Sequence, residues 1–177
     1  MKVLAFAASN SRHSINKQLV QYATSLMDGV EVEILDLNDY EMPIFSVDRE
    51  NAEGIPDLAH QLFNKIGKAD ALIISYAEHN GSYTAAYKNI YDWMSRIDMK
   101  VFQGKPMTLL ATSPGPGGAS NVLSAASTSA PYFGGELKSS LSVPKFFDNF
   151  DVSKGSLSNL DIQRELMEVL STLQASV

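Results

Sequence analysis

The sequence predicts an α/β protein built on a doubly wound parallel sheet of five strands, with helices on both faces. Short apolar runs typical of buried strands recur along the chain, and most are followed by a segment whose apolar residues return at helical spacing. Consecutive β-α units require right-handed crossovers, which make the strands parallel and cover both faces of the sheet. The length of 177 residues fits one domain, so we expect a single domain over residues 1–177.

The first half of the chain supplies three of these units. The expected strands cover residues 3–8, 30–35 and 71–74, and the second alternates apolar and charged residues, which indicates a more exposed strand. The helices that follow are expected over 15–26, from Pro56 to near Gly67, and over 87–97.

A long connection over residues 38–55 separates the second strand from its helix and contains the apolar cluster Met42-Pro43-Ile44-Phe45. Such a loop is often functional or part of an interface, and packing under the sheet explains it equally well. The second half of the chain predicts a strand over 107–111, a helix of small residues over 121–130, and a weaker strand within 135–143. The last helix is expected to begin at Ser158, because Ser158-x-x-Asp161 resembles a capping box.

Composition excludes several classes of function. The net charge of −6, with no basic stripe, argues against nucleic acid or an anionic membrane as the main partner. The absence of cysteine excludes disulfides and thiolate nucleophiles, and the three scattered histidines show no metal-ligand spacing. No apolar run approaches the roughly 20 residues of a membrane helix, and no signal peptide is visible. We therefore expect a soluble cytoplasmic protein that acts on a small molecule.

Ligands of doubly wound sheets bind at the carboxyl ends of the strands, which directs attention to the loops 9–14, 77–84 and 112–118. The first loop brings hydroxyl groups, an amide and the free N–H groups of a helix start to one place, which indicates an anion site. It lacks the glycines of the dinucleotide fingerprint and of the nucleotide-triphosphate loop, so a monophosphate fits better. Alternatively, Ser14 simply caps the helix and the other hydroxyls stabilise a turn.

The second loop, 77–84, follows the most buried strand and carries amide side chains and a glycine. Gly81 would let the backbone approach a flat ligand, and Glu78, His79 and Asn80 would reach the polar edge of that ligand. Taken alone, His79 is more often a surface residue than a ligand. The third loop, Ser113-Pro114-Gly115-Pro116-Gly117-Gly118, either turns the chain or presents N–H groups to a ring.

The spacing of these loops resembles the NAD(P)H-dependent FMN reductase family of flavodoxin-like proteins over nearly the whole chain. The first loop is similar to the family's phosphate loop, Gly-Ser-x-Arg-x-x-Ser-x-Asn. The second loop, running into Lys88-Asn89-Ile90-Tyr91-Asp92-Trp93, is similar to the family's Pro-Glu-Tyr-Asn-Gly-Ser followed by Lys-Asn-x-x-Asp-Trp. The third loop resembles the family's glycine-rich flavin loop, and residues 42–45 resemble its Leu-Pro segment. The resemblance implies a flavodoxin-like fold with strand order 2-1-3-4-5.

The resemblance also implies an FMN site in which the first loop holds the phosphate, the second lines the isoalloxazine and the third closes the other side. The implied cofactor-binding residues are Ser9, Ser11, Arg12, Ser14, Ile15, Asn16, Ala77, Glu78, His79, Asn80, Gly81, Ser113 and Gly115. Three departures stand out, since the family's arginine falls on Ser11, its proline on Ala77 and its tyrosine on His79. Arg12 is then the full positive charge that the first loop offers the phosphate.

The implied activity is ping-pong hydride transfer from NADPH or NADH through FMN to a quinone, flavin, azo compound or metal oxyanion, with no essential acid–base side chain. A flavodoxin-type electron carrier with a protein partner is the alternative, and a flavin-free interaction domain on the same fold is a third possibility. We expect a homodimer or homotetramer, because Tyr83, Tyr87, Tyr91 and Trp93 offer more aromatic surface than one inward helix face needs. Burial of that helix within one subunit explains these aromatics nearly as well.

Overall fold

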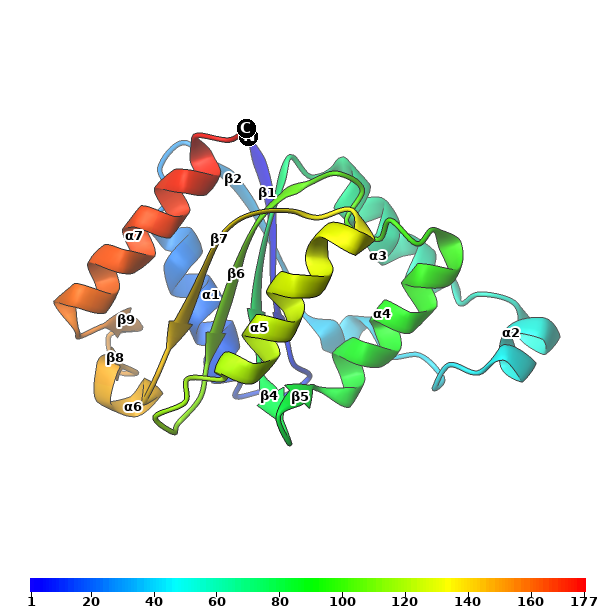
Figure 1. The fold of residues 1–177 in the computed structure, drawn as a ribbon, viewed down its shortest axis with the longest axis horizontal. Coiled ribbons are helices and arrows are strands. Elements are labelled where there is room, and N and C mark those ends of the chain that lie inside the picture. The colour runs from blue at the N-terminus through cyan, green and yellow to red at the C-terminus, as the bar shows by residue number, and fades with distance from the viewer.

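A five-stranded parallel sheet forms the centre of the computed structural model, which describes all residues 1–177 (Figure 1). The strands lie in the order β2-β1-β3-β6-β7, which is order 2-1-3-4-5 when the strands of this sheet are numbered along the chain. This confirms the predicted flavodoxin-like topology. The strand bounds are β1 Lys2–Ala8, β2 Glu31–Leu35, β3 Ala71–Tyr76, β6 Pro106–Thr112 and β7 Glu136–Val143.

Helices cover both faces of the sheet, as predicted. On one face, α3, α4 and α5 pack on a core of 29 buried residues that includes Leu4, Phe6, Leu72 and Ile74. On the other face, α1 and α7 pack on a core of 17 residues that includes Val3 and Ala5, because successive strand residues point to opposite faces. These helices are α1 Ile15–Ser25, α3 Asp57–Lys68, α4 Ala85–Ile97, α5 Ser120–Ser129 and α7 Leu160–Gln174.

The connection over 38–55 contains more regular structure than the sequence suggests. A 3-10 turn, Leu37–Tyr40, is followed by α2, Val47–Glu53, which has no buried residue and projects from the body of the protein (Figure 1). Because α2 buries nothing, it carries no apolar periodicity by which it could be predicted. A further 3-10 turn, Ala130–Phe133, follows α5, and α6 (Phe146–Asn149) precedes the small hairpin β8 (Phe150–Asp151) and β9 (Ser156–Leu157).

The N-cap of the last helix was predicted one residue too early, at Ser158, and the helix itself begins at Leu160. The N-cap of α7 is Asn159, whose side-chain oxygen accepts hydrogen bonds from the N–H groups of Asp161 (3.1 Å) and Ile162 (3.3 Å). Ser158 precedes this cap, and its backbone N–H donates to the carbonyl of Asn149 at 2.8 Å, which pairs it with the preceding segment. Asparagine and serine are similarly good caps, so the two neighbours are hard to distinguish by sequence.

The aromatic residues that suggested an oligomer are packed within the chain. Tyr87, Tyr91 and Trp93 of α4 are buried, and Tyr87 stacks on Tyr91 with ring centroids 5.6 Å apart. Tyr83 lies outside the helix, in a short strand before it, and packs against Tyr76 at 5.7 Å. Intramolecular packing therefore accounts for these rings, and the oligomeric state stays a prediction without their support. None of the helices is both long and apolar enough to cross a membrane.

Candidate functional site

The three loops singled out by the sequence meet at the carboxyl edge of the sheet. In Figure 1 the arrowheads of β6 and β7 point to this edge, where the hairpin β4–β5 also lies. A cavity of about 270 Å³ opens between the loops. It is lined by Ser9, Ser11, His13, Ser14, Ile15, Asn16, Ala77, Glu78, His79, Thr112, Ser113 and Pro114. Of the residues expected at the site, Arg12, Asn80, Gly81 and Gly115 do not line it.

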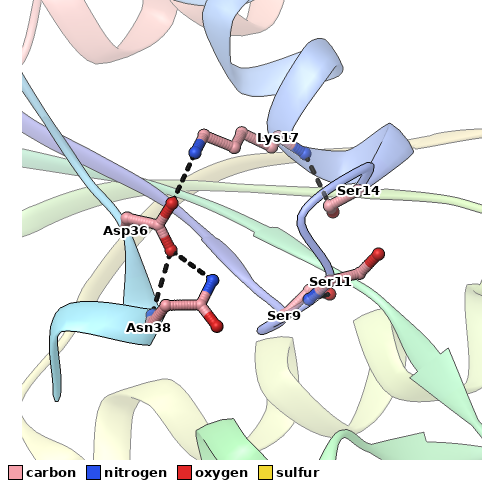
Figure 2. Close-up of polar contacts among 6 residues, drawn as sticks. All are labelled: Ser9, Ser11, Ser14, Lys17, Asp36 and Asn38. Atoms are coloured by element: carbon pink, nitrogen blue, oxygen red, sulfur yellow. Dashed lines mark hydrogen bonds and ion pairs between the residues drawn. The ribbon is translucent and has the colours of Figure 1, made fainter. Parts of the chain in front are cut away.

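The first loop leads into the amino terminus of α1, where the sequence predicts an anion site. Ser14 is the N-cap, and its hydroxyl accepts the N–H of Lys17 at 3.2 Å (Figure 2). The Ser9 hydroxyl accepts the N–H of Ser11 at 3.2 Å. The N–H groups of Ile15 and Asn16 have no backbone acceptor, as the first turn of a helix requires. No acidic residue stands in the first turn of α1. The positive end of its dipole therefore faces the cavity with no carboxylate from its own first turn beside it.

Two cations lie near this helix terminus, and they differ in their pairing. Lys17 is held by Asp36, with 2.6 Å between Nζ and Oδ2, and Asp36 also accepts hydrogen bonds from the backbone and side chain of Asn38 (Figure 2). Arg12 is exposed and forms no ion pair. Arg12 is thus the cation free to move toward an anion at the first loop.

The Lys17–Asp36 pair predicts a pH-dependent stability. Hydrogen bonds from Lys17 and Asn38 lower the pKa of Asp36 from 3.8 to about 2. The charged carboxylate therefore stabilises the fold above about pH 4, and this contribution disappears as the pH falls toward 2. Because the two side chains are 31% and 34% exposed, we expect Asp36→Asn to cost only about 1 kcal/mol at pH 7 after solvent screening.

Urea unfolding of the wild type and Asp36→Asn at pH 7 and pH 2.5 tests this expectation. The stability difference should be clear at pH 7 and should shrink at pH 2.5, whereas the exposed neighbour Asp39→Asn should show little difference at either pH. A difference of equal size at both pH values would contradict the ion-pair explanation.

Asn16 lines the cavity and also connects parts of the fold. Its side chain is 2% exposed and joins three elements: Oδ1 accepts from the Ser75 hydroxyl (2.8 Å) and the Thr112 N–H (3.1 Å), and Nδ2 donates to the Thr112 carbonyl (3.2 Å). Asn16 thereby fixes the start of α1 against the ends of β3 and β6. Sequence reasoning missed Ser75 and Thr112, because nothing local marks them as partners of a residue 59 or 96 positions away.

The second loop is a tight hairpin. Strands β4 (Glu78–His79) and β5 (Ser82–Tyr83) pair antiparallel, and the two turn residues Asn80 and Gly81 have positive φ angles of 52° and 76°. Asparagine followed by glycine is the preferred pair for such a turn. The positive φ of this turn accounts for a glycine at position 81, and a Cβ atom there would meet no other atom of the chain within 4 Å. The base of the hairpin, Glu78 and His79, is the part that lines the cavity.

Close packing requires a glycine at position 118 of the third loop. Gly118 has a φ of 57°, and a Cβ atom there would collide with Ser142 Oγ and lie 3.0 Å from the backbone nitrogen of Pro144. The Ser142 hydroxyl donates to the Gly118 carbonyl at 2.8 Å, which ties the loop to the end of β7. Ser113 and Pro114 are thereby held at the wall of the cavity.

A second cavity of about 230 Å³ lies beside the first loop, and Asn10 of that loop is part of its lining. Its remaining lining is mostly apolar and comes from residues 37–44 and from Ala85, Ala86, Asn89 and Ile90 of α4.

The motif residues Asn89 and Trp93 explain how the 42–45 segment is held. Asn89 accepts the Phe45 N–H at 2.8 Å and donates to the Met42 and Pro43 carbonyls, and Trp93 Nε1 donates to the Pro43 carbonyl at 2.7 Å.

Known proteins share both this sequence pattern and this fold. The profile of the family described as NADPH-dependent FMN reductase matches residues 1–145. PA1204 of Pseudomonas aeruginosa, an NAD(P)H-dependent FMN reductase, is 33% identical over 116 residues, which are 65% of this chain and 61% of that protein. A quinone reductase of Escherichia coli is 34% identical over 75 residues, 42% of this chain and 40% of that protein. The matches thus span less than two thirds of these curated relatives.

Among solved structures, FerB from Paracoccus denitrificans, described as a flavoenzyme NAD(P)H:(acceptor) oxidoreductase, superposes with a TM-score of 0.75. The superposition covers 98% of this chain and 97% of that one, and the 22% sequence identity makes it evidence for a shared fold. The match of the family profile to residues 1–145, over most of the 177 residues, shows that the chain belongs to the NADPH-dependent FMN reductase family.

Proposed function

We propose that the chain binds FMN in the cavity between the three loops and transfers electrons from NADPH or NADH to a small acceptor. The observation that carries this proposal is the amino terminus of α1, which opens into that cavity with no acidic residue in its first turn. Such a terminus suits a phosphate, because its N–H groups and dipole attract an anion.

The residues at this terminus fit a phosphomonoester. The hydroxyl groups of Ser9, Ser11 and Ser14 and the N–H groups of Ile15 and Asn16 would donate to its oxygens, and Arg12 would supply a positive charge. Asn16 would position the loop through its contacts to β3 and β6. The base of the hairpin and the third loop would flank the rest of the cofactor.

Bound FMN would supply the chemistry, since a flavin accepts a hydride from a nicotinamide and passes electrons to a second substrate. The protein would bind and orient the reactants, and we assign none of its side chains a proton-transfer step. No group of three or more His, Cys, Asp or Glu side chains gathers into a possible metal centre. Because donor and acceptor would use the same exposed face in turn, we propose a ping-pong order.

The optical spectrum of the purified protein tests this function. We expect the protein to take up added FMN and the flavin absorbance to bleach when NADPH or NADH is added without oxygen. Failure to bind FMN at micromolar concentration would overturn the proposal. Binding without bleaching by either nucleotide would indicate instead a flavodoxin-type carrier that depends on a protein partner.

A further inference from the structure

We propose that Glu78 is a positioning residue that locks the hairpin β4–β5 to the start of α5 and so fixes two walls of the cavity; this rests on the proposed FMN site. Its carboxylate is directed at the helix, since Oε2 accepts the backbone N–H of Val122 at 2.9 Å and Oε1 accepts from Asn121 Nδ2 at 3.3 Å. Both carboxylate oxygens are thus engaged by α5.

The helix needs this contact because it has no cap of its own. The residue before its first turn is Ala119, which lies in the left-handed conformation (φ 58°, ψ 35°) and has no side-chain oxygen. Val122 is the third residue of α5, and its N–H is one that an N-cap side chain normally accepts. Glu78 takes this role from 44 positions away. Its negative charge adds a favourable interaction with the positive end of the helix.

The position of α5 makes this cap relevant to the cavity. The helix begins directly after the third loop, and both Ser113 of that loop and Glu78 line the cavity. On its other side, the third loop is tied to the segment after β7, because Lys145 N–H donates to the Gly115 carbonyl (2.9 Å) and Phe146 N–H to the Ser113 carbonyl (3.0 Å). Glu78 supplies the corresponding tie toward the hairpin, so its loss would let the two walls move independently.

Because of this cap, the amino termini of α1 and α5, which both lie at this edge of the sheet, differ in whether a carboxylate of the chain neutralises them. The terminus of α5 is neutralised by a carboxylate of the chain itself, whereas that of α1 has no acidic partner in its first turn. A phosphate is therefore directed to α1. Glu78 acts on the cofactor through α5 and the shape of the cavity, and its oxygens are not needed as ligands of the flavin.

Two substitutions separate the cap from a direct flavin contact. Glu78→Ala removes both acceptor oxygens, whereas Glu78→Gln keeps a side-chain oxygen for the Val122 N–H and loses the charge and the acceptor of the weaker Asn121 bond. Amide hydrogen exchange of residues 120–123 in the FMN-free proteins reports the cap, and an FMN fluorescence titration reports the cavity. We expect Glu78→Ala to speed exchange there and to weaken FMN binding, each by about tenfold, and Glu78→Gln to restore most of both.

The exposed Glu165→Ala serves as the control and should change neither measurement. Weaker FMN binding by Glu78→Ala with unchanged exchange at 120–123 would overturn the proposal, because Glu78 would then contact the flavin directly. Faster exchange with unchanged FMN affinity would overturn it as well, since the cap would not shape the cavity. If the wild type itself bound no FMN, the proposed function would fail, whereas unchanged exchange at 120–123 would separately show that Glu78 does not hold α5.

Discussion

Ser14→Asp should abolish FMN binding and leave the FMN-free protein folded. Aspartate caps helices as well as serine does, and its charge interacts favourably with the helix dipole, so α1 should persist. The added carboxylate would lie at the helix terminus proposed for the phosphate, where two anions would repel each other. We expect FMN titrations to show no binding in the micromolar range and thermal melts of the apo-protein to remain close to the wild type.

Ser14→Ala provides the matched comparison. This substitution removes the hydroxyl that accepts the Lys17 N–H and caps α1, so it should lower the free energy of unfolding by about 1 kcal/mol. It also removes one hydrogen-bond donor to the phosphate, so it should lower FMN affinity by about ten- to a hundredfold. Riboflavin, which lacks the phosphate, should bind the wild type and both variants about equally weakly. A Ser14→Asp protein with normal FMN affinity would show that the phosphate binds elsewhere.

The sheet and its helices were predictable because a buried strand or helix face requires apolar residues at a regular spacing in the sequence. Strand β3 is buried along its whole length and begins with an unbroken apolar run over residues 71–74, whereas the edge strand β7 is only partly buried and could be placed only within a broad range. Helices α3 and α4 each bury one face and showed the corresponding spacing. Helix α2 buries nothing and left no such pattern.

The site was predictable as a set of loops, and the roles of its residues were harder to predict. Parallel topology brings strand ends together, so the three loops could be placed at one edge without knowing any contact. The partners of Asn16 and Glu78 are far away in the sequence, and their hydrogen bonds follow from tertiary packing that no local pattern records. Asn80 and Gly81 carry a recognisable hairpin signal, and their contact with a ligand stays a prediction.

Asn16→Ala should be among the most damaging single substitutions to the stability of this protein. It removes the partner of three buried groups, namely the Ser75 hydroxyl and the N–H and carbonyl of Thr112. An unpaired buried polar group costs about 1–3 kcal/mol, so we expect a total loss of about 3–5 kcal/mol. Urea unfolding should show this loss as a lower midpoint at an unchanged slope.

The exposed Asn64→Ala should change stability by no more than about 0.5 kcal/mol and serves as the control. Asn16→Asp gives a second test, because its carboxylate can still accept from Ser75 and the Thr112 N–H but leaves the Thr112 carbonyl without a donor. It should therefore be destabilised as well, with the carboxylate further opposing a phosphate nearby. If Asn16→Ala instead kept wild-type stability and lost only FMN binding, Asn16 would be a phosphate ligand, as the family resemblance first implied.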